Sequence, residues 1–496
     1  MRHSQHSANN KLHAARRSGA SPILTHITHI IFSTLSGEAL VDINSRRGSN
    51  AEMPCMFCLN VRNRNSVEML HHGGEYYVSH TEFDVTKLRY HTDESVRDIA
   101  RDLQVRSNIE SKTRFTLTQK QFGFTHNPGS ILLDDRLVAI YKPISATVFD
   151  WMHVLLIDGV FAIHMGCLMA RLKEFAVTYA TLHTFVKNWH WPGRINSRGV
   201  SGKDLCDPKH AAKWYELEKF KPSASEVLSL YPVFALFFAT LALPGELCRP
   251  EITCFLLLCD VVDAFMLVAR AKMTAERLHD VIVRYLTSFK AVHGDEYMVP
   301  KFHWLLHCGW QYMKHGILIA CFVHERKHRM LKRYARAIRN TSRDWEQSML
   351  AEVTDHHLAA LDHEDFSFDA RLVGESLKRP AADLVALLRV AFGGNADIKI
   401  ANDARFSEWG VARRGDVVMI VANGVHVVGR AFLFAAIDGD IFVGVDLWTR
   451  IDATRGSSRW RVSGDRRAVL DASAILETLI WSQTLDVATV IVPPWL

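Results

Sequence analysis

The sequence lacks internal repeats, long low-complexity tracts and a strong excess of charge of either sign. Its formal net charge is +6 at pH 7, with 48% hydrophobic and 23% charged residues, which is ordinary for a soluble globular protein and excludes a mainly disordered chain. The small charge is compatible with a nucleic-acid partner but gives no evidence for one, so a DNA-binding surface needs local clustering of basic residues. A chain of 496 residues is long enough for about two to four domains.

The sequence also lacks the cysteine pattern of a disulfide-linked secreted protein. Its nine cysteines are odd in number and mostly scattered through apolar segments, which favours buried free thiols in a reducing compartment. No apolar core follows the basic start of the chain, which excludes a secretory signal. Residues 1–30 are therefore predicted to be a disordered basic arm, although a transit peptide has the same composition.

Long hydrophobic runs are few, and the best candidate for a membrane span is residues 252–270. Asp260 and Asp263 lie within this stretch, and a carboxylate inside lipid is costly. We therefore expect a buried helix at this place and no membrane partner.

Hydrophobic periodicity divides the remaining chain into three parts. Residues 31–145 are mixed, with strands predicted at 24–35 and 74–78 and an amphipathic helix at 92–110. Residues 146–390 are predicted to be mostly helical, with helices at 148–184, 250–290, 301–313, 321–339 and 341–361. Residues 402–496 change to β-branched runs at 416–421, 425–434 and 441–447, separated by Asn-Gly and Asp-Gly, with a last strand at 487–492. These dipeptides are hairpin signals and predict a small antiparallel β module.

Cys55 and Cys58 have the two-residue spacing that lets both thiolates reach one zinc ion from a single turn. Two further ligands must come from elsewhere, and His71, His72 and His80 follow within about 25 residues. A Cys₂His₂ structural zinc site with His71 and His80 is one interpretation. Two loop cysteines without a metal are the alternative.

Asp150 and His153 stand three residues apart among apolar neighbours, so on a helix they would share one face. A half-buried carboxylate usually has a cation or a metal as its partner, which makes the pair a candidate metal site. The alternative, which the spacing alone favours, is an N-cap aspartate beside a packed histidine.

Glu325 stands at the start of the densest basic segment of the chain, whose spacing would give a helix one strongly positive face. Such a face suits a phosphate backbone, and a solvated cationic helix face is the alternative. The candidate DNA-binding residues are Arg326, Lys327, Arg329, Lys332, Arg333 and Arg336. Phosphoryl transfer by two metals needs several carboxylates, so Asp150 and Glu325 could supply two ligands and a third is required. An unrelated metal enzyme using His303, His307 and Glu325 is a further alternative.

Five motifs follow one another in an order that resembles a known family. They are the segment 54–61 with its two cysteines, Phe-Gly-Phe at 122–124 with Asn-Pro at 127–128, Asp-Trp-Met-His at 150–153, Pro-Lys-Phe-His-Trp-Leu-Leu-His at 300–307, and Glu-Arg-Lys-His at 325–328. This order resembles the transposases of cut-and-paste DNA elements of the CACTA type, and in particular the transposase-derived proteins found in many copies in dinoflagellate genomes. The resemblance covers roughly residues 35–345.

The resemblance implies an RNase H-like core with an Asp-Asp-Glu triad and a helical insertion before the glutamate. It implies that Asp150 and Glu325 are the second and third triad residues, and that His153 orients ligands or contacts phosphate. Asp42 is assigned as the first triad residue, with Glu38 as the alternative. A triad of this kind would use Mg²⁺ to cleave and rejoin DNA ends.

The expected fold is therefore α+β, an RNase H-like core with a large helical insertion followed by a C-terminal small antiparallel SH3-like β-barrel. The expected partner is DNA at transposon ends, with a homo-oligomer allowed, and the expected location is the nucleus. The resemblance implies an N-terminal DNA-binding region that we do not recognise in this sequence, so we expect a truncated or decayed copy. The rival hypothesis is a catalytically inactive, transposon-derived protein that binds nucleic acid or a partner protein.

Overall fold

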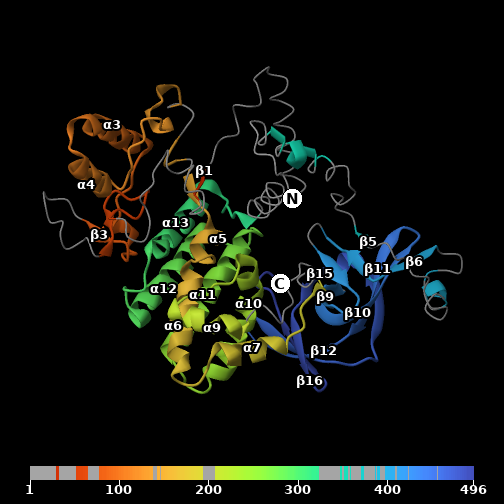
Figure 1. Ribbon diagram of the computed structural model, residues 1–496. Helices are drawn as coiled ribbons and strands as arrows, with labels where there is room; N and C mark the ends of the chain where they lie inside the picture. The colour runs from red at the N-terminus through yellow and green to blue at the C-terminus, as the bar shows by residue number, and fades with distance from the viewer. Residues whose placement is uncertain are drawn as a thin grey trace. The chain divides into compact units, whose positions relative to one another are not determined.

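The computed structural model describes residues 30–32, 52–64, 77–137, 142–145, 147–193, 207–322, 347–348, 351–355, 358, 370–373, 386, 388–390, 392, 397–407, 410–422, 424–454 and 456–496. The chain forms two compact units, one from residues 1–160 and 274–321 and the other from residues 161–273 and 322–496. Helices and antiparallel sheets both contribute (Figure 1), which confirms the α+β class.

The first unit contains two short pairs of parallel strands. β1 (Ile30–Phe32) pairs with β4 (Thr147–Phe149), and β2 (Val61–Arg62) pairs with β3 (Val78–Ser79). β1 lies within the strand predicted at 24–35, and β3 begins at the last residue of the one predicted at 74–78. The helix predicted to begin at residue 148 is wrong at its start, because β4 is buried on both faces and shows no alternation that would mark a strand.

The helices of the first unit are α3 (Asp93–Ile109), α4 (Lys112–Phe122), α5 (Trp151–Leu155), α12 (Ala275–His293) and α13 (Pro300–His315), with short 3₁₀ turns at Val85–Lys87, Ile131–Leu133 and Asp135–Leu137. The predictions at 92–110 and 301–313 are confirmed. Thr92 and Ser95 form a capping box at the start of α3, and Gly316 ends α13 with a left-handed φ of 69°. α13 packs beside α12 and also contacts α5 and β4.

The helices of the second unit are α6 (Val160–Lys173), α7 (Tyr179–Lys187), α9 (Ala211–Glu216), α10 (Ala224–Phe237) and α11 (Arg249–Val268), with a π-helical turn at Phe238–Ala242 and a 3₁₀ turn at Pro208–His210. The single helices predicted at 148–184 and 250–290 are both wrong, because the chain breaks them. Asp158, Ala176 and Ala271 adopt left-handed φ values of 45°, 62° and 54°. Ala176 and Ala271 carry no turn signal, whereas Asp158 precedes Gly159, an Asp-Gly pair that marks a turn and that the helix prediction passed over.

The helix predicted to be buried rather than membrane-spanning is α11, which has ten buried residues. Within it, Asp263 accepts a hydrogen bond of 2.8 Å from the Tyr231 hydroxyl. Among the residues that the structure describes, one stretch, Trp151–Lys173, is long and apolar enough to cross a membrane, with a mean hydropathy of 1.7. It is 89% buried, as in the core helix of a soluble protein, so it is weak evidence for a span.

Three antiparallel sheets make up the remainder of the second unit. Their orders are β14-β11-β10-β9-β15 with β6 also paired to β10, β12-β13-β17-β16, and β5-β7-β8. The strands are β5 (Arg371–Val373), β6 (Ile398–Ala401), β7 (Asp403–Arg405), β8 (Val411–Arg413), β9 (Val417–Ala422), β10 (Val425–Ile437), β11 (Asp440–Leu447), β12 (Thr449–Thr454), β13 (Ser457–Arg461), β14 (Arg467–Asp471), β15 (Ile475–Leu479), β16 (Trp481–Thr484) and β17 (Val487–Ile491), with a 3₁₀ turn at Ala472–Ala474. The four predicted strands correspond to β9, β10, β11 and β17.

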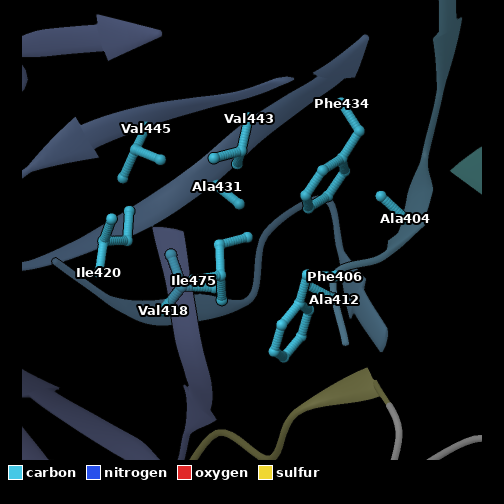
Figure 2. Close-up of a cluster of buried hydrophobic side chains, with 10 residues drawn as sticks. All are labelled: Ala404, Phe406, Ala412, Val418, Ile420, Ala431, Phe434, Val443, Val445 and Ile475. Carbon is cyan, nitrogen blue, oxygen red and sulfur yellow. The ribbon is translucent and has the colours of Figure 1, made fainter. Parts of the chain in front are cut away.

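The predicted hairpin turns are also present. Asp438 and Gly439 join β10 to β11 with φ values of 51° and 100°, the pair of positive angles that such a tight turn requires. The sequence of β9 is an unbroken apolar run because the strand lies between two hydrophobic clusters. Val418 and Ile420 enter the core cluster drawn in Figure 2, while Val417 and Met419 face a second cluster with Trp448, Trp460 and Trp481. Both faces of β9 are therefore buried.

Candidate metal centre

Four potential metal ligands meet in the first unit. Cys55 and Cys58 lie in the loop before β2, and His303 and His307 lie one turn apart on the same face of α13. All four side chains are buried, and their ligand atoms lie within 4.8 Å of one another. The sequence separation between the two halves is 245 residues from Cys58 to His303.

The distances fit a zinc ion. The Sγ atom of Cys55 lies 3.2 Å from Nε2 of His307, and that of Cys58 lies 3.3 Å from Nε2 of His303. The two histidine Nε2 atoms are 3.0 Å apart. A tetrahedral zinc with ordinary bond lengths needs about 3.6 Å between sulfur and nitrogen and about 3.3 Å between nitrogens, so shifts of a few tenths of an ångström suffice. Two thiolates and two imidazoles are a donor set that selects zinc over Mg²⁺.

The protonation of the site agrees with this donor set. Burial opposes ionisation of Cys55, but its hydrogen bond with Cys58 and the nearby His307 and His303 hold the pKa of Cys55 well below its usual value. Burial lowers the pKa of His303, which favours the neutral imidazole. A thiolate and a neutral imidazole are the forms that bind zinc.

Aromatic side chains surround the four ligands. The Trp304 indole N–H donates to the Pro54 carbonyl at 2.9 Å and so ties α13 to the cysteine loop. Phe149 stacks on both Trp304 and His307, and Phe57 lies 5.5 Å from His307 between ring centroids. These contacts exclude water from the site and fix the histidine rings, as the surroundings of structural zinc require.

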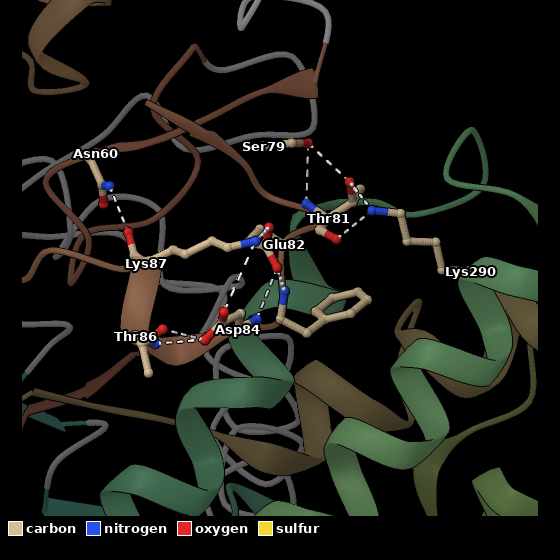
Figure 3. A network of polar contacts seen from close by, with 9 residues as sticks. Asn60, Ser79, Thr81, Glu82, Asp84, Thr86, Lys87 and Lys290 are labelled. Atoms are coloured by element: carbon tan, nitrogen blue, oxygen red, sulfur yellow. Dashed lines mark hydrogen bonds and ion pairs between the residues drawn. The ribbon is translucent and has the colours of Figure 1, made fainter. Parts of the chain in front are cut away.

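A network of polar contacts holds the loop that follows the cysteine segment (Figure 3). The Asn60 amide donates to the Lys87 carbonyl at 2.9 Å, and Lys87 in turn pairs with Glu82 at 2.9 Å. Lys290 of α12 donates to the Thr81 carbonyl at 2.9 Å. The loop from residue 79 to 87 is thereby attached to both the cysteine segment and the helix pair.

The histidines of the site differ from those expected from the sequence. His80 is buried outside the group, since its Nδ1 accepts from the Arg64 backbone N–H at 3.2 Å and its Nε2 donates to the Met298 carbonyl at 2.7 Å. His71 lies outside the described residues. The prediction of a zinc site at Cys55 and Cys58 gains support, but the two histidines that meet these cysteines are far away in the sequence and not the nearby ones. The helical His-x-x-x-His spacing of His303 and His307 was the usable signal.

Asp150 and His153 form a buried pair at the end of β4. Asp150 is the N-cap of α5, and its Oδ1 accepts from the Met152 N–H at 3.0 Å and from the Cys321 N–H at 3.1 Å. Its Oδ2 bonds His153 Nδ1. This is the N-cap arrangement that the spacing favoured, and together with Cys321 the pair makes a second group with the spacing of metal ligands.

The other predicted site residues lie outside the described residues. They are Asp42, Glu325 and the basic residues Arg326, Lys327, Arg329, Lys332, Arg333 and Arg336, and the helices predicted at 321–339 and 341–361 lie mostly outside as well. No family model matches the chain, and no curated protein matches it.

Proposed function

We propose that this protein is a transposase-like DNA-binding protein, with an RNase H-like core in its first unit that a structural zinc ion stabilises. The order of motifs along the chain supports this assignment, as does the parallel pairing of β1 with β4 directly before Asp150. An SH3-like closure of the C-terminal strands belongs to the same proposal, since the β9–β10 and β10–β11 hairpins are the kind such a barrel uses. In this role the protein would act in the nucleus.

The position of Asp150 carries the catalytic form of the proposal. It follows a strand whose partner is parallel, and ligands in sheets of this kind gather beyond the carboxyl ends of the strands. Its Oδ1 also accepts from the Cys321 backbone N–H. Glu325 follows Cys321 by four residues in the sequence.

In this form Asp150, Glu325 and Asp42 would hold Mg²⁺, which in such sites activates water and stabilises the leaving oxygen of a phosphodiester. The basic residues from Arg326 to Arg336 would contact DNA phosphates. The zinc ion takes no part in the chemistry and acts only on the fold.

The burial of Asp150 favours a second candidate function. Its side chain has no exposed surface, and both of its oxygens already accept hydrogen bonds. A carboxylate used in this way supports α5 and the chain at Cys321, as an N-cap does in many proteins. The second candidate is therefore a catalytically inactive, transposon-derived protein that binds nucleic acid or a partner protein.

DNA binding and Mg²⁺-dependent nicking of terminal-repeat DNA separate these possibilities. The variants are Glu325→Gln and, as a matched control, Glu352→Gln at an exposed helical position. Nicking by wild type and Glu352→Gln but not by Glu325→Gln, with equal DNA binding by all three, supports the catalytic form. DNA binding without nicking supports the inactive form. If the wild-type protein binds no DNA, the proposal that it is a transposase-like DNA-binding protein is refuted.

A further inference from the structure

A pocket of about 250 Å³ lies beside the metal centre in the first unit. Three aromatic side chains contribute to its lining, Phe57 from the cysteine loop, Tyr90 from the loop before α3 and Trp310 from α13. Polar lining comes from Asp93, Ser145 and Lys314. Ligand sites for whole cofactors occupy about 300–1,000 Å³, so this pocket is matched to a single small ring system.

Two of the aromatic rings stack on each other, and one of them, Tyr90, is exposed to solvent. Tyr90 and Trp310 are nearly parallel, with an interplanar angle of 6° and centroids 6.2 Å apart, and Phe57 presents its edge to Trp310 at 5.8 Å. Tyr90 is 43% exposed despite these contacts, so it offers a large ring surface to solvent. Burial of the hydroxyl and the nearby cysteines raise the pKa of Tyr90 to about 12, so the ring is neutral.

The polar groups give the pocket one available positive charge. The Asp93 carboxylate already accepts from the Ser145 hydroxyl and from the N–H groups of Ser145 and Ile144, at 2.6, 2.9 and 2.7 Å. Lys314 lies 4.9 Å from the centroid of the Trp310 ring and donates to the Ser145 carbonyl at 3.2 Å. The nearby Asp93 carboxylate also attracts this ammonium. An ammonium has three N–H donors, and Lys314 uses one of them on the Ser145 carbonyl, so it keeps donors for an anionic ligand.

We propose that this pocket binds one unpaired nucleobase of a DNA strand, stacked on the exposed Tyr90 ring, with Lys314 at the adjoining phosphate. The inference rests on the proposed DNA-binding function and names how a strand would be held. Stacking on aromatic rings beside a cation is how proteins bind single-stranded or extruded bases, because every base presents a flat face. A fully paired base pair is too large for the pocket and offers no free face.

The metal centre lies against the pocket and holds two of its walls in place. Phe57 lies between the two cysteine ligands in the sequence, and the Tyr90 ring makes an edge contact with His307 at 6.2 Å. Trp310 lies three residues after His307 on α13. Two of the pocket walls, Phe57 and Trp310, therefore belong to segments that the metal joins, and Tyr90 contacts one of the ligands.

The test compares two probes of equal length, a DNA duplex with one bulged 2-aminopurine and the fully paired duplex, binding to the full chain. Wild type is expected to prefer the bulged probe and to quench its fluorescence. Tyr90→Ala should weaken binding of the bulged probe by about 5- to 150-fold, since stacking of one base on an aromatic ring accounts for that range, and should leave the paired duplex unchanged. Tyr90→Phe should bind as wild type because it keeps the ring. Tyr297→Ala, which removes an exposed tyrosine outside the pocket, is the matched control.

Equal binding of both probes by wild type, or an equal loss for Tyr90→Ala and Tyr297→Ala, overturns the inference while leaving DNA binding established. A wild-type protein that binds neither probe refutes the proposed function first, and the inference falls with it. Circular dichroism of Tyr90→Ala distinguishes a lost contact from a lost fold.

Discussion

Loss of the zinc ion should destabilise the first unit strongly. The perturbation is removal of one ligand by His307→Ala, or of the metal by a strong chelator. Both act on a site whose two halves meet only in the folded chain, because Cys58 and His303 are separated by 245 residues. The metal therefore works as a cross-link, and its loss frees the unfolded chain from a very long loop.

The size of the effect follows from that separation. The chain-entropy relation used for disulfides gives about 5.5 kcal/mol for closing a loop of this length, as an upper estimate. The first unit contains about 200 residues, for which each kcal/mol shifts the melting temperature by roughly 2–4 °C. We therefore expect the melting transition of this unit to fall by roughly 10–20 °C.

Metal analysis and thermal melting measure this directly. The purified protein should contain one equivalent of zinc, and His307→Ala should contain none and melt earlier. His315→Ala is the matched control, because it removes a histidine from the same helix, two turns beyond the ligands. Protein purified without metal, a melting temperature that a chelator leaves unchanged, or equal melting of the two variants would refute the reasoning.

Two further predictions concern the surroundings of the metal. The stability of the first unit should fall as the pH drops below about 6.5. Burial lowers the pKa of His80 in the folded protein, where its Nδ1 accepts a hydrogen bond from the Arg64 N–H. The unfolded chain therefore binds a proton at a pH where the folded chain does not, and this favours unfolding. Melting of wild type and His80→Gln between pH 7.5 and 5.5 checks this, and an equal slope for both counts against it. Trp304→Phe should keep the ring stack on Phe149 but lose the hydrogen bond to the Pro54 carbonyl. We expect this loss to weaken zinc affinity by about tenfold, as measured by competition with a chelator. Unchanged affinity would show that the indole N–H does not support the metal site.

Local features of the fold could be predicted from the sequence because their causes are local. The amphipathic helix at 92–110 and the Asp438-Gly439 turn depend on neighbours within a few positions, and both predictions are confirmed. The break at Asp158 carries an Asp-Gly signal, but the breaks at Ala176 and Ala271 could not be predicted. A left-handed residue without glycine is stabilised by its tertiary surroundings, and the apolar periodicity continues across it.

The candidate site shows the same division. Cys55 and Cys58 are recognisable from their spacing, but the choice among 26 histidines depends on which of them the fold brings near. His80 was expected because it is close in sequence, and backbone groups occupy both of its ring nitrogens. His303 and His307 share a helical face, which marks them as a pair without saying which cysteines they would meet.

The helix that carries the zinc ligands also supports Asp150. His303, His307 and Gln311 are spaced four residues apart on α13, so they lie along one stripe of the helix. The Gln311 carbonyl oxygen accepts from the Phe149 N–H at 3.0 Å, and Phe149 is the residue before Asp150. A shift of α13 after metal loss therefore reaches Asp150 through a single buried hydrogen bond. If Asp150 acts in strand cleavage, zinc removal should abolish that activity even though zinc takes no part in the reaction, and added Mg²⁺ should fail to restore it.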